Sequence, residues 1–461
     1  MSSTLILGAG LAGLSAAILL ARSGHQVTLV EQDTAQGRRR GLQQLPHIHL
    51  NLSLWRELGE NELPELPHRL LAHGALRLNL LAANPPLRGV PFTEADHRFE
   101  TVTARRAVHQ RVLEQLAGTV PGVSIHWGEQ VQDLIVTEAG KPARVLGVRT
   151  RSGTEFRAEL TVDASGRRSA LPRWLARAQL PAAREERAER GSVYYSRHYR
   201  SAGGRPPALL AGTLQPYHGL SIITLPADND TWSVAIVTGS EDAELRRLRD
   251  PANWELALRQ YPRAAHWLQG EPLSDDVAVM AALHDQKRSL LSDSGQPLVG
   301  GLVLLGDAWA STDPTLGRGS SITLKHALLL RRLLTEINPG SEPLRFTREF
   351  ETLSQRELGP LINRSSWYIR QRLQELYADV AGERLVSDAD WQRVQASRHL
   401  ELTDPDLARH FAAGAYLLDE NTERFRRPEL LDERLAAVLA GSWDRYPHGG
   451  PDYQRLLKLL S

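Results

Sequence analysis

A glycine-rich stretch near the start of the chain reads Ile6-Leu7-Gly8-Ala9-Gly10-Leu11-Ala12-Gly13-Leu14-Ser15-Ala16-Ala17. A short apolar strand runs into a Gly-x-Gly-x-x-Gly turn and then into an Ala-rich helix. In this pattern Gly8 permits the tight turn, Gly10 lets the backbone approach a pyrophosphate, and Gly13 lets helix and strand pack closely. The stretch therefore predicts a dinucleotide site with the phosphates on the helix N-terminus.

A second strand supports this interpretation. Residues 26–30, Gln-Val-Thr-Leu-Val, are expected to form a second buried strand, and Glu31 follows them at the carboxyl end. A carboxylate roughly twenty residues beyond the glycines is where the fingerprint needs an acceptor for ribose hydroxyls. A glycine-rich turn without a ligand is the alternative, but the strand, the helix and Glu31 in register favour the dinucleotide.

Composition excludes several classes of function. The chain has 461 residues, 41% of them hydrophobic and 24% charged, with a formal net charge of +1. This balance, without a basic patch interleaved with aromatics, gives no reason to expect a nucleic-acid partner. The chain has no cysteine, which excludes disulfides and thiolate chemistry and agrees with a cytoplasmic location.

Two further absences are expected from the sequence. No uncharged apolar run reaches the ~18 residues of a membrane span, so we expect no integral membrane segment. The densest pair of metal-ligand side chains is His47 and His49, but no spaced carboxylate or third histidine completes a motif. We therefore expect no metal site.

The pattern along the chain predicts an α/β protein with four segments. Residues 1–190 form the first part of a Rossmann-like cofactor domain with a β-meander, and 191–284 form an inserted antiparallel sheet over a substrate pocket. Residues 285–340 return to the cofactor domain, and 341–461 are helical. Locally, we expect a helix over 101–116, a four-stranded meander at 123–127, 131–136, 145–150 and 154–160, and helix breaks at Pro360, Pro405, Pro428 and Pro447.

Two further motifs narrow the function. The first is Asp163-Ala164-Ser165-Gly166-Arg167-Arg168-Ser169, and the second is Gly306-Asp307-Ala308-Trp309-Ala310-Ser311-Thr312-Asp313-Pro314-Thr315-Leu316-Gly317-Arg318-Gly319. With the fingerprint, they resemble the flavoprotein hydroxylase superfamily of FAD-dependent monooxygenases, whose fold is that of p-hydroxybenzoate hydroxylase. The resemblance covers about the first 340 residues. It implies a glutathione-reductase-like FAD-binding domain with an inserted antiparallel substrate sheet and a helical C-terminal region.

The resemblance also implies which residues bind FAD. Asp307 would accept hydrogen bonds from the ribityl chain unless it is only a helix N-cap, and the helix beginning near Gly319 would face the flavin pyrimidine with its positive end. Arg106 would contact FAD, with a surface salt bridge as the alternative, and Asp163 is structural or near the cofactor rather than catalytic. The full set is Gly8, Gly10, Leu11, Ala12, Gly13, Glu31, Gln32, Arg40, Arg106, Val131, Asp163, Gly306, Asp307, Pro314, Gly317, Gly319 and Ser320.

A closer similarity is to the flavin epoxidase and hydroxylase-like group associated with polyketide and polyether tailoring. It is carried by residues 44–50, 162–175, 184–187 and 195–199. The chain departs from that group at Trp309, Arg318 and the pair Ser320-Ser321. We expect Trp309 and Arg318 in the substrate pocket, together with His47 and His49. The strand aromatics Tyr194, Tyr195, His198 and Trp232 are expected mainly to fill the core, and no catalytic residue is assigned.

The resemblance implies an FAD-dependent monooxygenase. It would transfer oxygen from a flavin C4a-hydroperoxide, formed with O2, to a small aromatic or alkene substrate such as a secondary metabolite. Electrons would come from NAD(P)H or from a separate flavin reductase. The alternatives are a reductase similar to geranylgeranyl reductases and a flavoprotein without turnover. A halogenase is disfavoured because no Trp-x-Trp-x-Ile-Pro occurs and the first lysine is Lys141.

Overall fold

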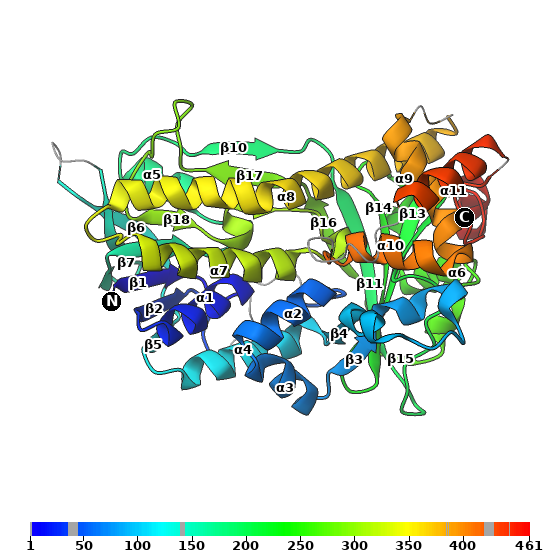
Figure 1. The fold of residues 1–461 in the computed structure, drawn as a ribbon, viewed down its shortest axis with the longest axis horizontal. Helices are drawn as coiled ribbons and strands as arrows, with labels where there is room; N and C mark the ends of the chain where they lie inside the picture. The colour runs from blue at the N-terminus through cyan, green and yellow to red at the C-terminus, as the bar shows by residue number, and fades with distance from the viewer. Residues whose placement is uncertain are drawn as a thin grey trace.

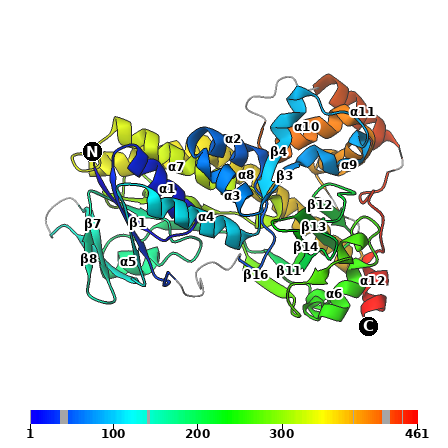
Figure 2. The same cartoon turned by 90° about the horizontal axis from the view of Figure 1, so that it is seen from below.

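Two sheets organise the molecule, and a long helix runs from one to the other (Figure 1). The computed structural model describes residues 2–35, 45–138, 143–383, 385, 387–418, 428–441 and 443–461. The N-terminal strand belongs to the first sheet, whereas the C-terminal helix lies beside the second, so the two ends of the chain are at opposite ends of the molecule (Figure 2).

The first sheet is fully parallel and contains the fingerprint strand at its centre. Its strands are, in spatial order, β18 (Leu302–Leu304), β9 (Leu160–Asp163), β1 (Ser3–Leu7), β2 (Gln26–Glu31) and β5 (Val123–Trp127). Because parallel strands end at one edge, the residues that follow β1, β2, β9 and β18 gather there. In such sheets ligands bind outside the carboxyl ends of the strands.

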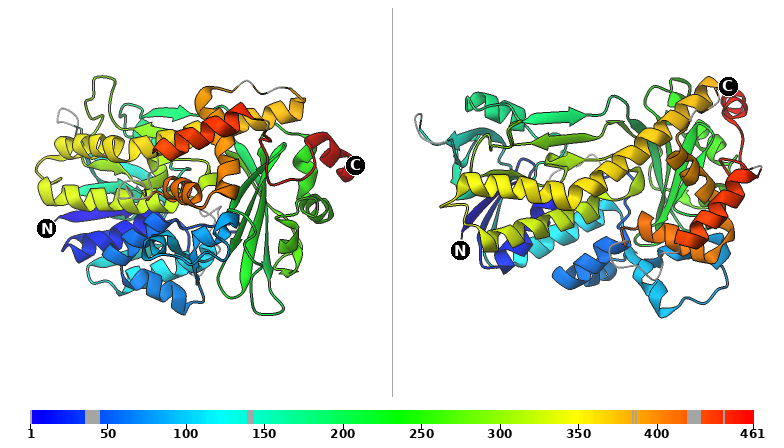
Figure 3. Two further views of the ribbon diagram at one scale, coloured as in Figure 1. Left: turned by 45° about the vertical axis from the view of Figure 1, so that its right-hand side comes forward. Right: turned by 45° about the horizontal axis from the view of Figure 1, so that its top comes forward.

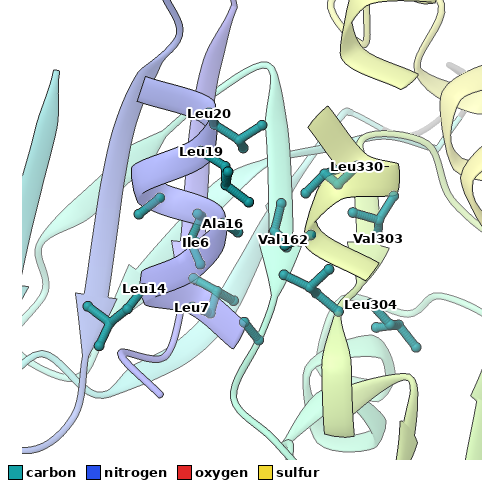
Figure 4. Close-up of a cluster of buried hydrophobic side chains, with 14 of the residues drawn as sticks. Ile6, Leu7, Leu14, Ala16, Leu19, Leu20, Val162, Val303, Leu304 and Leu330 are labelled. Carbon is teal, nitrogen blue, oxygen red and sulfur yellow. The ribbon is translucent and has the colours of Figure 1, made fainter. Parts of the chain in front are cut away.

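Helices cover this sheet and form its core. Helix α1 (Leu11–Arg22) packs beside α7 (Gly319–Glu336), and α4 (Arg106–Thr119) lies on the other side of α1. Figure 4 shows side chains from β1, α1, β9, β18 and α7 meeting in one apolar cluster. All the labelled members are at most 2% exposed: Ile6, Leu7, Leu14, Ala16, Leu19, Leu20, Val162, Val303, Leu304 and Leu330. Such a core makes the cofactor edge rigid.

Two local expectations differ from the structure. The meander has three strands, β6 (Val131–Val136), β7 (Val145–Thr150) and β8 (Glu155–Arg157), because β5 pairs in parallel with β2 instead. The expected helix over 101–116 begins only at Arg106. The β-branched residues before it form β4 (Glu100–Thr103), which pairs with β3 (Leu76–Asn79), in keeping with their preference for strands.

The second sheet is antiparallel, as expected. It contains β12 (Leu214–Tyr217), β13 (Leu220–Pro226), β14 (Thr231–Gly239), β11 (Ser192–Arg200), β15 (Glu271–Pro272) and β16 (Ala278–Leu283). One face carries Tyr195 and packs under α6 (Pro251–Leu258) and α12 (Tyr453–Leu460). The other face carries Tyr194, Met280 and Leu283. Successive strand residues point to opposite faces, which separates the two tyrosines.

The tail is helical, as expected, but one of its breaks is absent. Helix α8 (Pro343–Ala381) runs through Pro360 for 39 residues and spans the molecule (Figure 3). Pro360 removes one hydrogen-bond donor, while Leu358 and Ile362 beside it stay buried and hold the helix in place. Pro405 and Pro428 begin helices α10 (Pro405–Ala415) and α11 (Pro428–Ala440), which follow α9 (Ala389–Thr403).

The remaining described elements are short. They are α2 (Ser53–Glu62), α3 (Glu65–Ala72), α5 (Leu171–Arg177) and the small sheet of β10 (Arg184–Arg187), β17 (Gln286–Ser289) and β19 (Ala310–Ser311), together with short 3-10 turns. Among the helices that the structure describes, none has both the length and the apolar character needed to cross a membrane.

Candidate active site

A cavity of about 760 Å³ lies between the carboxyl edge of the first sheet and the inner face of the second. Segments far apart in the sequence line it, from β1 to α8. Its lining contains most of the residues predicted for the site: Gly8, Gly10, Leu11, Ala12, Glu31, Gln32, His47, His49, Arg106, Val131, Gly306, Asp307, Pro314, Gly317, Gly319 and Ser320. The fold therefore brings the three motifs together around one space.

The glycine turn has the geometry that the fingerprint requires. Gly8 has φ +104°, and a Cβ there would lie 2.8 Å from the carbonyl oxygen of Ala164. Gly13 does not line the cavity, because it is buried against the strand, and a Cβ there would lie 1.9 Å from the Gly8 oxygen. Gly13 thus allows helix and strand to approach, and Gly10 opens the helix N-terminus to the cavity.

Glu31 is held beside the glycine turn. Its Oε2 accepts a hydrogen bond from the Ala9 N–H at 2.7 Å, and its Oε1 accepts one from the Asp33 N–H at 2.9 Å. A carboxylate has further acceptor sites, so Glu31 can still receive ribose hydroxyls. Gln110 of α4 donates to the Ala9 carbonyl at 2.6 Å. The sequence analysis missed Gln110, although its position one helical turn after Arg106 places it on the same face of α4.

Asp163 lies behind the cavity wall and holds residues that line the cavity. Its side chain is 0% exposed and is not part of the cavity lining. It accepts hydrogen bonds from the Ser165 N–H at 3.0 Å and from the Ser165 and Ser169 hydroxyls, and burial raises its pKa. The residues that it holds, Ala164 to Gly166, do line the cavity.

Asp307 projects from the turn that follows β18. Burial raises the pKa of its carboxyl group, whereas Arg167 and Arg106 lower it. The short 3-10 turn Gly306–Ala308 starts at Gly306, which has φ +60°. Asp307 is the N-cap of neither this turn nor α7, so the alternative expectation of a simple cap is wrong. Its carboxylate faces the cavity, where it can accept hydrogen bonds.

The other end of the cavity lies at the start of α7. The 3-10 turn Pro314–Leu316 ends at Gly317 with φ +64°, and the 18-residue helix follows from Gly319. Gly319 and Ser320 line the cavity, so the positive end of the α7 dipole is directed at this space.

Two predicted histidines line the cavity near this end. His47 is 3% exposed, and its Nδ1 lies 2.9 Å from the Ser196 hydroxyl of β11. His49 Nε2 lies 3.2 Å from Nδ1 of His109. Burial, aided by His198, lowers the pKa of His47 to about 4, and burial also lowers that of His49. Both rings are therefore neutral near pH 7. Among the described residues, no group of three or more His, Asp or Glu side chains is placed to hold a metal ion.

The inner face of the second sheet closes the cavity. Tyr194, Met280 and Leu283 line it, and Ile362 of α8 lines it as well. The Tyr194 hydroxyl donates to Oδ1 of Asp313 at 2.6 Å, and burial raises its pKa, so the phenol stays protonated. The sequence analysis expected Tyr194 to fill the core. Only strand alternation could have separated it from Tyr195, and the sequence did not show which face is the cavity side.

Comparison with known proteins identifies the family. Residues 1–344 match the family model described as FAD binding domain. The chain belongs to this family. It has an FAD-binding domain with the flavoprotein hydroxylase fold. Protein Rv3254 of Mycobacterium tuberculosis is 28% identical over 372 residues, which are 72% of this chain and 73% of that protein.

Solved structures support the fold. PqsL from Pseudomonas aeruginosa, described as a probable FAD-dependent monooxygenase, superposes with a TM-score of 0.59 at 18% identity, covering 82% of this chain and 99% of that one. A flavoprotein/dehydrogenase from Cytophaga hutchinsonii superposes with a TM-score of 0.63 at 16% identity, covering 95% and 99%. Because one fold carries several flavin chemistries, this likeness fixes the architecture and leaves the reaction to the site.

The unsatisfied polar atoms of the site fit FAD. Arg106 is 6% exposed, and its Nε and Nη1 have no hydrogen-bond partner among the described residues. Burial lowers its pKa to about 10, although Asp307 opposes the shift. No described carboxylate pairs with Arg106, so the alternative of a surface salt bridge is wrong. The Ser320 hydroxyl is likewise without a partner. An anionic ligand rich in hydroxyl and carbonyl groups, as FAD is, satisfies such atoms.

Two residues expected in the substrate pocket lie elsewhere. Trp309 is 1% exposed and outside the cavity lining, with its indole N–H directed to Glu351 at 3.4 Å. Arg318 is also outside the lining, because its guanidinium donates to the Ser365 hydroxyl at 3.1 Å and to the Gly414 carbonyl at 3.4 Å. Both side chains point into the tail helices rather than the expected substrate pocket. Arg40 lies outside the described residues.

Proposed function

We propose that this flavoprotein is a monooxygenase that hydroxylates or epoxidises a small aromatic or alkene substrate. FAD held at this site and reduced would supply the oxygen-transfer chemistry by reacting with O2. The observation that carries the proposal is one cavity that joins the FAD motifs to the apolar face of the second sheet.

The chain's own contribution is a dry, shaped space beside the cofactor. Ile48, Leu50, Met280, Leu283 and Ile362 line it with apolar surface. Exclusion of water protects a reactive oxygen donor from wasteful decay and places the substrate at a defined angle. The neutral rings of His47 and His49 add hydrogen-bonding groups without charge.

Tyr194 is the side chain we propose to orient the substrate. The Tyr194 hydroxyl donates to Asp313 and also contacts the Thr315 hydroxyl, which leaves one acceptor site on its oxygen for a substrate hydroxyl. Tyr194→Phe should leave FAD affinity unchanged and lower the fraction of consumed O2 that appears in product. Tyr195→Phe is the matched control, because Tyr195 lies on the opposite face of the same strand.

The electron donor is proposed to be NAD(P)H or reduced flavin from a separate reductase. Anaerobic mixing of the FAD-loaded protein with NADH, with NADPH, or with a flavin reductase and its donor separates these sources. Bleaching of the flavin by a nucleotide alone identifies direct reduction.

The deciding experiment is rapid mixing of the reduced, FAD-loaded protein with O2, with and without a panel of aromatic and alkene compounds. A transient hydroperoxide absorbance band and an oxygenated product support the proposal. Slow reoxidation in every case, with anaerobic reduction of an alkene, would instead identify a reductase similar to geranylgeranyl reductases. FAD binding without reduction or turnover of any compound would identify a non-catalytic flavoprotein.

A further inference from the structure

His326 of α7 lies directly behind the turn that carries Asp307. Its ring is 0% exposed, and its Nδ1 is 3.1 Å from the backbone nitrogen of Gly306. On the other side, Nε2 is 2.9 Å from the hydroxyl of Ser354 on α8, and this hydroxyl donates to the Phe350 carbonyl at 2.7 Å. One chain of hydrogen bonds thus joins the cofactor turn to two helices.

These contacts determine where the proton of the ring resides. A backbone N–H can only donate, so Nδ1 must accept and carries no proton. Burial lowers the pKa of His326 to about 3, which keeps the ring neutral and leaves its single proton on Nε2. Nε2 then donates to Ser354, whose own hydrogen is used on Phe350. Each donor in the chain therefore has one acceptor.

The ring is also fixed by packing. It stacks on Phe350 with 8° between the planes and meets Trp309 edge to face at 5.0 Å between centroids. In front of the ring, a Cβ on Gly306 would lie 2.9 Å from the Ala12 side chain. The turn is therefore held between the fingerprint helix and His326, with little room to shift.

We propose that His326 is a positioning residue for FAD. It does not line the cavity, and it acts by holding the Gly306 N–H so that Asp307 presents its carboxylate to the cofactor. Through Ser354, it also links FAD affinity to α8, which runs beside α7 (Figure 1). The inference concerns cofactor binding and does not depend on the proposed reaction.

Substitutions separate the hydrogen bond from the packing. In His326→Asn the amide oxygen can take the place of Nδ1, so the Kd for FAD should rise by no more than a few fold. In His326→Leu the Gly306 N–H loses its acceptor, so the turn no longer holds Asp307 in the binding position, and the Kd should rise about 10- to 100-fold. The Kd of Ser354→Ala for FAD should lie between the values for these two variants. Titration of the apoprotein with FAD, followed by flavin fluorescence, measures all three.

The control is another buried histidine far from the cofactor. Burial lowers the pKa of His448 to about 3 as well, and its ring lies beside Tyr217 of the second sheet. His448→Leu should lower stability and leave the Kd for FAD unchanged. Equal FAD affinity in His326→Leu and the unmodified protein would overturn the proposal.

A direct measurement needs neither FAD nor activity. 15N NMR of histidine-labelled apoprotein should include a ring with unprotonated Nδ1 and protonated Nε2 that does not change from about pH 8 to about pH 5, and the signal of this ring should be missing in His326→Asn. A proton on Nδ1, or titration of this ring within that range, would contradict the hydrogen-bond chain.

Discussion

Arg105 and Arg106 are neighbours at the start of α4, and the structure gives them opposite environments. Arg105 donates from its backbone and its guanidinium to Asp228, a fully buried carboxylate, at 2.6 to 3.1 Å. Arg106 has no carboxylate partner among the described side chains and faces the cavity. The charge of Arg105 thus ties α4 to the second sheet, whereas that of Arg106 is left for the cofactor.

Substitution of Arg106 should therefore separate folding from binding. Arg106→Met removes a buried, unpaired charge, so thermal unfolding of the apoprotein should show no loss of stability. The Kd for FAD should rise at least about tenfold, because the ligand loses a charged donor. A fluorescence titration with FAD measures this.

Substitution of Arg105 should instead lower stability and leave FAD binding nearly unchanged. Arg105→Met leaves Asp228 buried and unpaired, which should lower the free energy of unfolding by about 3 kcal/mol. FAD affinity of the folded protein should stay within about twofold. If both variants weakened FAD binding equally, or destabilised the apoprotein equally, the assigned roles would be wrong. Urea unfolding and FAD titration of the two proteins give the comparison.

At the scale of single elements, α8 is the helix least expected from its sequence. Pro360 lies inside it and is exposed, and the helix continues because Leu358 and Ile362 on its buried side are held by packing. Pro360→Ala restores a backbone donor, so the free energy of unfolding should rise by about 1 kcal/mol or more. Urea unfolding measures the change. A loss of stability would show that the helix needs the proline to reach the second sheet.

The far end of α8 is attached to the second sheet by buried charges. Arg372 donates to the carbonyls of Tyr217 and Leu220 at 2.7 and 2.6 Å. Glu375 accepts from Arg372 at 2.6 Å and from Arg398 of α9 at 2.9 Å. All three charged side chains are at most 6% exposed, so each charge depends on the others.

Neutralising this carboxylate should destabilise the tail without touching the cofactor. Glu375→Gln leaves two buried guanidinium groups without a counter-charge, and the free energy of unfolding should fall by about 3 to 5 kcal/mol. Glu357→Gln is the control, because its pair with Arg356 lies on the surface and should contribute less than about 1 kcal/mol. Urea unfolding monitored by tryptophan fluorescence compares them, and similar losses in both variants would contradict the buried network.

At the scale of the whole molecule, buried neutral histidines should make the protein acid-sensitive. Burial lowers the pKa of His109 and His326 to about 3 and that of His47 to about 4. An unfolded histidine titrates near about 6.5, so below that pH the unfolded chain binds protons that the folded chain cannot. Stability should be constant above about pH 7 and fall as the pH drops toward about 4.

The buried histidines account for how steeply stability falls with pH. Between about pH 6.5 and about pH 4, each such histidine lowers the free energy of unfolding by up to about 1.4 kcal/mol for each pH unit of acidification. Glu401 acts in the opposite direction, because burial raises its pKa to about 7 and the folded state takes up its proton first. Urea unfolding at about pH 8, 7, 6 and 5 measures the net effect. In His326→Asn the free energy of unfolding should change less steeply with pH, by the equivalent of one bound proton. Constant stability down to about pH 5 would contradict the prediction.

The cofactor half of this protein could be predicted from short local patterns. The spacing of Gly8, Gly10 and Gly13, the position of Glu31, and the Gly306-Asp307 motif each follow from local backbone geometry at the end of a parallel strand. Such local requirements can be recognised from short stretches of residues. The division of the chain at residues 190, 284 and 340 stays a prediction.

The substrate side depends on how distant segments pack together. Whether Tyr194 or Tyr195 faces the cavity, and whether Trp309 and Arg318 point to the pocket or to the tail helices, depends on which elements pack against each face. The same applies to His326, whose partners Gly306 and Ser354 lie on two other segments. A local pattern predicts on which face of its helix or strand a side chain lies. The residues that contact that face come from segments distant in sequence, so the local pattern does not predict them.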